Sequence, residues 1–244
     1  TPTLQTADVS LKLDQPKAAA QVRFSLKDPA GETLVDKTVS AEPEIHAVLD
    51  YPQAVAWTPD NPMLYRCEAA LLDEKGKVLD IRETRFGFRT AVFDAEKDFL
   101  LNGRPVKIKG LCAHQDFGLT GIAVPDNIYR YRVEMMKEMG ANGYRTSHYP
   151  HDPATMDALD EMGFLVLAEI RHFDSNDDAM HQLEITVKRA RSRPSVIFWS
   201  TGNEEMRYHN YEQGVNSQRA MMARVKRLDP YRPVTTAVGK PQYS

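Results

Sequence analysis

The chain has 244 residues, of which 42% are hydrophobic and 27% charged, and its formal net charge is -3 at pH 7. This length and composition indicate a globular protein of one large or two ordinary domains. Without a strongly basic block, a nucleic acid is not an expected partner, because phosphate binding needs clustered Lys and Arg. No apolar run approaches transmembrane length, so no membrane segment is expected.

Residues 1–92 carry apolar side chains at every second position. Val9, Leu11 and Leu13 alternate with polar residues, and the pattern returns in later runs that are separated by turn signals such as 28–31 and 74–76. About seven short strands with such punctuation are typical of an antiparallel sandwich. We therefore expect an immunoglobulin-like β-sandwich over residues 1–92.

The two cysteines, Cys67 and Cys112, lie in different apolar runs and have no metal-type spacing. A free cysteine in such a run behaves as a small hydrophobe. We expect neither a disulfide nor a metal site from them.

After residue 92 strand-like and helix-like segments alternate. The predicted strands are 106–112, 143–147, 164–170, 196–200 and 234–238, and the predicted helices lie within 128–139, 153–162, 180–190 and 215–228. Alternation at this range indicates parallel βα units. Both a doubly wound sheet and a (β/α)8 barrel fit this pattern.

Polar residues at the predicted strand ends favour the barrel. A barrel gathers its strand ends into one ring, where barrel enzymes keep their active sites. The glycine fingerprint of a dinucleotide-binding fold is absent after the first strand. We expect residues 93–244 to form the N-terminal part of a (β/α)8 TIM barrel, incomplete because it has five strands. The strand-end residues are His114, Arg145, His148, Glu169, Asn203 and Glu204.

The segment 198–205 (FWSTGNEE) ends a buried strand in an amide and two carboxylates. Glycosidic bond hydrolysis needs one carboxylic acid to protonate the leaving oxygen and a second carboxylate as nucleophile or base. Alternatively, Asn203 caps a following helix and Glu204 and Glu205 lie in its first turn, where negative charge is favourable. The segment alone leaves both interpretations open.

Four motifs in this order resemble glycoside hydrolase family 2, and its β-galactosidases most closely. They are 99–106 (FLLNGRPV), 109–116 (KGLCAHQD), 142–150 (NGYRTSHYP) and 199–205 (WSTGNEE). Residues 57–59 (WTP) and 61–65 (NPMLY) are similar to the sandwich that precedes the barrel in that family. The resemblance covers nearly the whole chain.

The resemblance implies a role for each of five residues. Glu204 matches the catalytic acid/base, and Asn203 matches the neighbour that binds the sugar 2-hydroxyl. His114 and His148 match histidines that line the sugar site, and Arg145 matches an arginine that orients the nucleophile. The alternatives are that the histidines are structural and that Arg145 pairs with Glu169 in the barrel interior.

The chain departs from the family pattern at two places. Magnesium, bound by some members through a Glu and a His after the third strand, has no matching ligands in 172–175 (HFDS). No organic cofactor is implied. The family nucleophile is a Glu at the end of the seventh strand, so we expect this chain to be a truncated, inactive fragment without it.

The expected activity of the parent protein is hydrolysis of terminal β-D-galactosides with retention, on a carbohydrate substrate with water. Alternatives are β-glucuronidase or β-mannosidase activity within the family, or a non-catalytic sugar-binding or scaffold protein. Unpaired strand edges of an incomplete barrel make a homo-oligomer a further expectation. Residues 1–3 (TPT) give no compartment signal that separates secretion or the periplasm from the cytoplasm.

Overall fold

The computed structural model describes residues 4–14, 19–205 and 211–238. The chain forms two compact units, Thr1–Val106 and Lys107–Ser244. The boundary at residue 92 that the sequence predicts stays a prediction. No described helix is long and apolar enough to cross a membrane.

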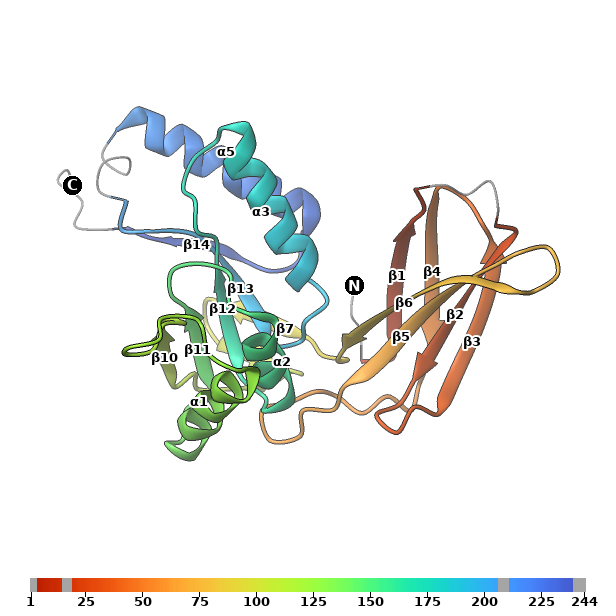
Figure 1. Ribbon diagram of the computed structural model, residues 1–244. Helices are drawn as coiled ribbons and strands as arrows, with labels where there is room; N and C mark the ends of the chain where they lie inside the picture. The colour runs from red at the N-terminus through yellow and green to blue at the C-terminus, as the bar shows by residue number, and fades with distance from the viewer. Residues whose placement is uncertain (1–3, 15–18, 206–210, 239–244) are drawn as a thin grey trace. The chain divides into compact units, whose positions relative to one another are not determined.

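The first unit is a β-sandwich built of antiparallel strands, drawn from red to orange in Figure 1. Along β4 every second residue is buried, and Phe24 and Leu26 on β2 and Leu49 on β4 are fully buried. This confirms the sandwich that the period of two predicts. One sheet pairs β1 (Thr6–Lys12) with β4 (Glu44–Asp50), and the other has the order β3 (Thr33–Ser40), β2 (Gln21–Lys27), β5 (Tyr65–Leu72), β6 (Val78–Phe86).

The last element of this unit along the chain is a small sheet of β7 (Ala91–Asp94), β8 (Asp98–Leu101) and β9 (Arg104–Pro105). Asn102, in the turn after β8, has a φ of 51°, a left-handed conformation that Asn tolerates better than most residues. Its Oδ1 accepts a hydrogen bond from the Thr90 amide at 2.9 Å, and its Nδ2 donates to the Trp57 carbonyl at 3.0 Å. One side chain therefore fixes the turn against the buried Trp57 segment.

The second unit has a sheet of five parallel strands in sequential order, with helices between them (Figure 1). A doubly wound sheet reverses its strand order at a switch point, whereas a barrel does not, so this order is that of a partial TIM barrel. The strands are β10 (Gly110–Ala113), β11 (Gly143–Thr146), β12 (Leu165–Glu169), β13 (Val196–Asn203) and β14 (Val234–Ala237), and the helices are α1 (Asp126–Glu138), α2 (Pro153–Glu161), α3 (Asp177–Ala190) and α5 (Glu212–Leu228).

The first barrel strand is shorter than predicted, because residues 106–109 are not in a strand. The side chain of Asn142 takes the place of a strand neighbour there. Its Oδ1 accepts from the Lys109 amide at 2.7 Å, and its Nδ2 donates to the Lys107 carbonyl at 2.9 Å. The apolar pattern of 106–112 therefore predicted a strand where a side chain satisfies the backbone instead.

Helix ends follow the predicted local chemistry. The Asp152 carboxylate caps α2 by accepting from the Ala154 amide, and Pro153 occupies the first turn. Gly140 and Gly163, just after α1 and α2, have φ values of 84° and 73°. Glycine adopts this left-handed conformation without a steric cost, so both helices end where the sequence predicts.

The two faces of the barrel sheet differ in chemistry. Val166 and Ala168 on β12 and Trp199 on β13 belong to the core shared with the helices. Side chains alternate along a strand, so Glu169 and Ser200 fall on the opposite face. Arg145 on β11 is paired in register with Leu167 on β12. Leu167 lies two residues before Glu169 and so faces the same side, and Arg145 therefore lies on that face too. The sheet thus separates an apolar helix-covered face from a face that carries polar and charged groups.

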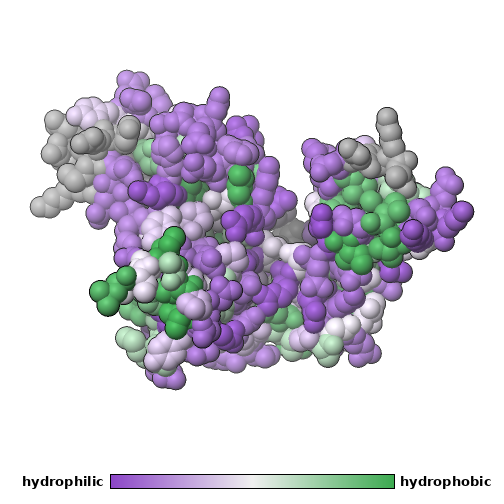
Figure 2. Space-filling view, in the orientation of Figure 1, coloured by the Kyte–Doolittle hydropathy of each residue, from purple (hydrophilic) through white to green (hydrophobic). Residues whose placement is uncertain are grey.

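The surface visible in Figure 2 is largely hydrophilic, with apolar groups in scattered patches. In the second unit, Leu119 and Ile122 are exposed in the loop after β10. Self-association of the chain stays a prediction.

Iodoacetamide at about pH 8 is expected to modify Cys112 and to spare Cys67 in the folded protein. Both thiols are free, Cys112 is exposed, and Cys67 is buried. Burial, reinforced by the charge of Glu68, raises the pKa of Cys67 to about 11. Mass spectrometry of tryptic peptides before and after urea unfolding measures this difference. Equal labelling of both cysteines in the folded state would contradict the buried position of Cys67.

Candidate active site

A buried carboxylate, Glu169, lies at the carboxyl end of β12 and is the centre of a polar cluster. Its side chain is 0% exposed. Oε2 accepts from Arg145 Nε at 3.0 Å, from Arg145 Nη2 at 2.7 Å and from Ser200 Oγ at 2.9 Å. Oε1 accepts from His148 Nδ1 at 2.7 Å. Both oxygens of the carboxylate are therefore occupied by protein donors.

Arg145, on β11, joins this carboxylate to the end of β13. Its Nη2 also donates to Asn203 Oδ1 at 2.6 Å, and its side chain is 24% exposed. Burial opposes the positive charge, but the hydrogen bonds to Glu169 and its negative charge outweigh burial and raise the pKa of Arg145. Removing one member of a buried ion pair typically costs about 3–5 kcal/mol. The pair therefore holds β11, β12 and β13 in a fixed relation at this edge.

The two predicted histidines lie together beside this pair. The rings of His114 and His148 meet edge to face, with their centroids 5.0 Å apart. A carboxylate only accepts hydrogen bonds, so the contact with Glu169 places a proton on Nδ1 of His148. His148 Nε2 is then the ring nitrogen that remains for a ligand.

Asn203 and Glu204 follow each other at the end of β13. The side-chain oxygen of Asn203 accepts the hydrogen bond from Arg145, and the first turn of a helix that it would cap lies outside the described residues. Glu204 is exposed, has a φ of 47°, and donates its backbone amide to the Ala237 carbonyl of β14 at 2.8 Å. A left-handed conformation is uncommon for a residue with a side chain, and such strain is concentrated at functional sites.

Gly202 allows the end of β13 to pass close to the segment after β12. A Cβ at this position would lie 2.7 Å from Cδ2 of Phe173, which is too close for a side chain. Packing thus explains the glycine in the 199–205 motif, because the absence of a side chain lets the Phe173 ring pack against the backbone just before Asn203.

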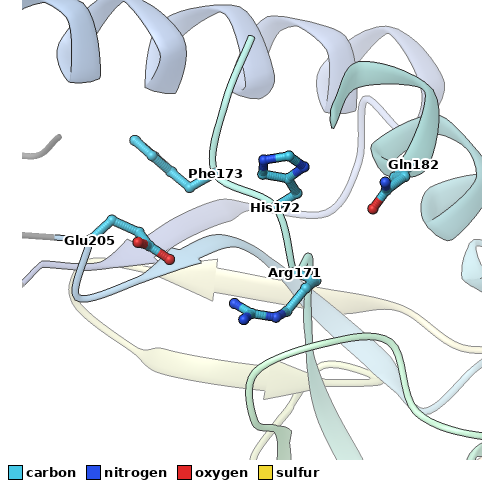
Figure 3. A pocket seen from close by; sticks show the side chains of 5 residues that line it. All are labelled: Arg171, His172, Phe173, Gln182 and Glu205. Atoms are coloured by element: carbon cyan, nitrogen blue, oxygen red, sulfur yellow. The ribbon is translucent and has the colours of Figure 1, made fainter. Parts of the chain in front are cut away.

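Beside these residues is an open pocket of about 390 Å³, lined by Arg171, His172, Phe173, Gln182 and Glu205. Figure 3 shows Arg171, His172 and Phe173 on the segment that leaves β12, with Glu205 facing them from the end of β13 and Gln182 on α3. The side chains that line this pocket include the cationic Arg171 and the anionic Glu205.

The stretch after β12 does not supply a recognisable metal site. Among residues 4–14, 19–205 and 211–238, no three His, Cys, Asp or Glu side chains are grouped to hold an ion. His172 instead lies 3.9 Å from Asp178 of α3. The expectation from the sequence, that the magnesium ligands of some family members are not matched in this chain, stays a prediction.

The structure thus brings together four of the five predicted site residues: His114, Arg145, His148 and Asn203. Glu204 follows Asn203 directly in the chain, and the approach of its side chain to the others stays a prediction. Sequence reasoning considered Glu169 only as an ion-pair partner of Arg145, and the structure shows this pair. It did not single out Ser200. Their positions along the predicted strands could have identified them, because side-chain alternation places both on the same face of the sheet as Arg145.

Comparison with known families decides the assignment. The model of glycosyl hydrolases family 2 matches residues 1–89, and that of the family's TIM barrel domain matches 92–176 and 171–242. The chain belongs to glycosyl hydrolases family 2. The polar cluster of this family 2 chain therefore lies in the domain that the second match covers.

Individual relatives carry two different names. The chain is 35% identical to a putative β-glucuronidase of Formosa agariphila over 85% of this chain and 20% of that protein. It is 32% identical to a β-galactosidase of Bacteroides ovatus over 89% of this chain and 31% of the relative. The chain thus spans about a fifth to a third of the length of these relatives.

Solved structures show the same similarity. A glycosyl hydrolase family 2 member from Bacteroides cellulosilyticus matches with a TM-score of 0.85 and 32% identity, over 98% of this chain and 35% of that one. A β-glucuronidase of Parabacteroides merdae matches with a TM-score of 0.83 and 26% identity, over 95% and 31%. Both domain types predicted from the sequence, the sandwich and the partial TIM barrel, are those of the family.

Proposed function

We propose that this chain is part of a retaining glycosidase that hydrolyses terminal β-D-galactosides, with Glu204 as acid/base. The observation that carries the proposal is the pair Asn203 and Glu204 at the end of β13, with Asn203 fixed by Arg145. A barrel enzyme keeps its chemistry at the carboxyl ends of its strands. The pair lies at such an end.

In the proposed first step, Glu204 gives its proton to the glycosidic oxygen while a carboxylate attacks the anomeric carbon. The C–O bond to the leaving group breaks and a glycosyl-enzyme ester forms. In the second step, the Glu204 carboxylate takes a proton from water, which attacks the same carbon and releases the sugar with retained configuration. The exposure of Glu204 gives water access to this carboxylate in the second step.

The proposed sugar contacts come from Asn203, His148 and His114. The oxygen of the Asn203 amide is held by Arg145, so its amino group is the part that is left to donate to the sugar 2-hydroxyl. His148 has its Nδ1 held by Glu169, so Nε2 is the nitrogen for a sugar hydroxyl. Hydrogen bonds that strengthen in the transition state accelerate the reaction, whereas equally strong ones do not.

β-Glucuronidase activity is the second candidate, because relatives of that name match the chain as well as β-galactosidases do. A glucuronide brings a carboxylate that needs a cation. Within the described cluster, the Arg145 guanidinium is already bound to Glu169 and Asn203, which favours a neutral sugar. Under this alternative, Arg171, which lines the neighbouring pocket, would bind the carboxylate of the glucuronide.

A panel of nitrophenyl glycosides tests this proposal on the full-length gene product. We expect kcat/KM for the β-galactoside to exceed the values for the β-glucuronide and the β-mannoside by at least about tenfold, a difference of about 1.4 kcal/mol in transition-state binding. A preference for the glucuronide that is lost in Arg171→Ala would replace the galactoside proposal with the alternative. Proton NMR of the first-formed sugar anomer measures retention.

A further inference from the structure

Glu169 is a charged residue in the interior of the second unit. Its side chain is fully enclosed, and its backbone amide is also bound, donating to Thr146 Oγ1 at 2.8 Å. Exchanging a buried ion pair for well-packed apolar residues is often neutral or stabilising. Stability alone therefore does not account for a carboxylate at this position.

The residues that bind Glu169 also contact, or themselves are, candidate sugar-binding residues. Arg145 donates from one nitrogen, Nη2, to both Glu169 Oε2 and Asn203 Oδ1, at 2.7 and 2.6 Å. With Nε also bound to Glu169, the plane of the guanidinium is fixed by the carboxylate. A fixed guanidinium plane in turn fixes which edge of the Asn203 amide faces the site.

His148 is held by the other oxygen of the same carboxylate. The hydrogen bond to Oε1 fixes the ring orientation and directs the Nδ1 proton at Glu169. Carboxylates commonly orient functional histidines in this way, because the partner of one ring nitrogen sets the role of the other. One buried group thus controls the direction of two side chains that, in the proposed function, face the sugar.

A second buried carboxylate in the same unit provides a comparison. Asp160 of α2 is 4% exposed and accepts from Arg193 Nη1 at 2.6 Å and from the Ser195 amide at 3.1 Å. Ser195 directly precedes β13, so this pair lies at the strand end opposite to Asn203. It resembles the Glu169 pair in chemistry but not in position.

We propose that Glu169 is a positioning residue of this glycosidase: without touching the sugar, it orients Asn203 through Arg145 and orients His148 directly. This rests on the proposed function. Its consequence is specific, because Asn203 is expected to act on the sugar 2-hydroxyl. Loss of Glu169 should therefore cost more on a substrate that has this hydroxyl than on one that lacks it.

The experiment compares kcat/KM of the full-length gene product on nitrophenyl β-galactoside and on its 2-deoxy analogue. Glu169→Gln keeps the size of the side chain and removes the charge. We expect a loss of about 100-fold on the galactoside, since misplacing a positioning group by about 1 Å can have this effect, and of at most about tenfold on the 2-deoxy substrate. In an Asn203→Ala background, the same change should cost far less on the galactoside.

Asp160→Asn is the matched control. It removes an equally buried charge and is expected to lower the melting temperature while leaving the ratio between the two substrates unchanged. Ser200→Ala, which removes a single donor to Glu169, is the milder second variant if Glu169→Gln does not fold. It should move the ratio in the same direction by a smaller factor.

Two outcomes separate this inference from the proposed function. If the unmodified protein hydrolyses no β-glycoside, the proposed function fails, and the inference with it. If the unmodified protein is active but Glu169→Gln or Ser200→Ala lowers both substrates by the same factor, Glu169 is merely structural and this inference alone is overturned.

Discussion

Glu204→Ala in the full-length gene product is expected to reduce kcat/KM by about 10²–10⁴-fold on substrates with poor leaving groups, such as an alkyl β-galactoside. The same change should cost far less on a dinitrophenyl galactoside. A good leaving group departs with little protonation, so loss of the general acid is felt mainly where the departing oxygen is basic. Steady-state kinetics across a series of leaving groups measures the difference as a steeper dependence on leaving-group pKa.

Azide provides the second half of this experiment. A small anion attacks the glycosyl-enzyme without needing a base, so it should restore turnover of the activated substrate in Glu204→Ala and yield a β-galactosyl azide. Glu205→Ala is the matched control, since it removes the adjacent carboxylate, which lines the neighbouring pocket. It should keep the leaving-group dependence of the unmodified protein. Equal losses on both substrate types in Glu204→Ala would remove Glu204 from the acid/base role.

Much of the fold could be predicted because its signals are local. The alternation of Val22, Phe24 and Leu26, and the cap and proline at Asp152 and Pro153, depend on side chains within a few residues of each other. The strand expected at 106–109 was wrong for the complementary reason. Its backbone is held by Asn142, more than 30 residues away, as the bond from the Lys109 amide shows.

The candidate site could be predicted only as a set of strand ends. The positions of Arg145, Glu169 and Asn203 after successive strands implied one edge of a parallel sheet, and the structure places them there. The pairing of Arg145 with Glu169 was one alternative from the sequence, but the sequence could not decide it, because the pairing depends on strand register. Opposite Arg145 on β11 is Leu167, and opposite Glu169 on β12 is Ser200. A slip of one residue would turn Glu169 toward the helices and dissolve the cluster.

The 244-residue chain by itself is expected to show no hydrolysis of β-galactosides above the uncatalysed rate. Retaining hydrolysis needs two carboxyl groups roughly 5–5.5 Å apart on opposite sides of the anomeric carbon. Glu204 supplies one. The resemblance to the family implies a nucleophile at the end of a seventh barrel strand, and the described sheet has five strands.

The described carboxylates near Glu204 are poorly placed to substitute for that nucleophile. Glu169 is 0% exposed, with both oxygens bound by Arg145, Ser200 and His148, so attack on a sugar would require breaking these bonds. Glu205 follows Glu204 directly and lines the pocket with Arg171. Successive side chains at a strand end point in different directions, so these two cannot easily flank one sugar carbon.

The test is an assay of the purified chain beside its Glu204→Ala variant, with product measured by chromatography over hours. Equal, background-level rates are the expected result. If barrel strands outside these 244 residues carry the nucleophile, a mixture with a separately expressed polypeptide that contains those strands should gain activity. Turnover by the chain alone that disappears in Glu204→Ala would show that a carboxylate within these 244 residues acts as the nucleophile. Repeating the assay with Glu169→Gln and Glu205→Ala would identify that carboxylate, and a nucleophilic Glu169 would have to leave its enclosed position during the reaction.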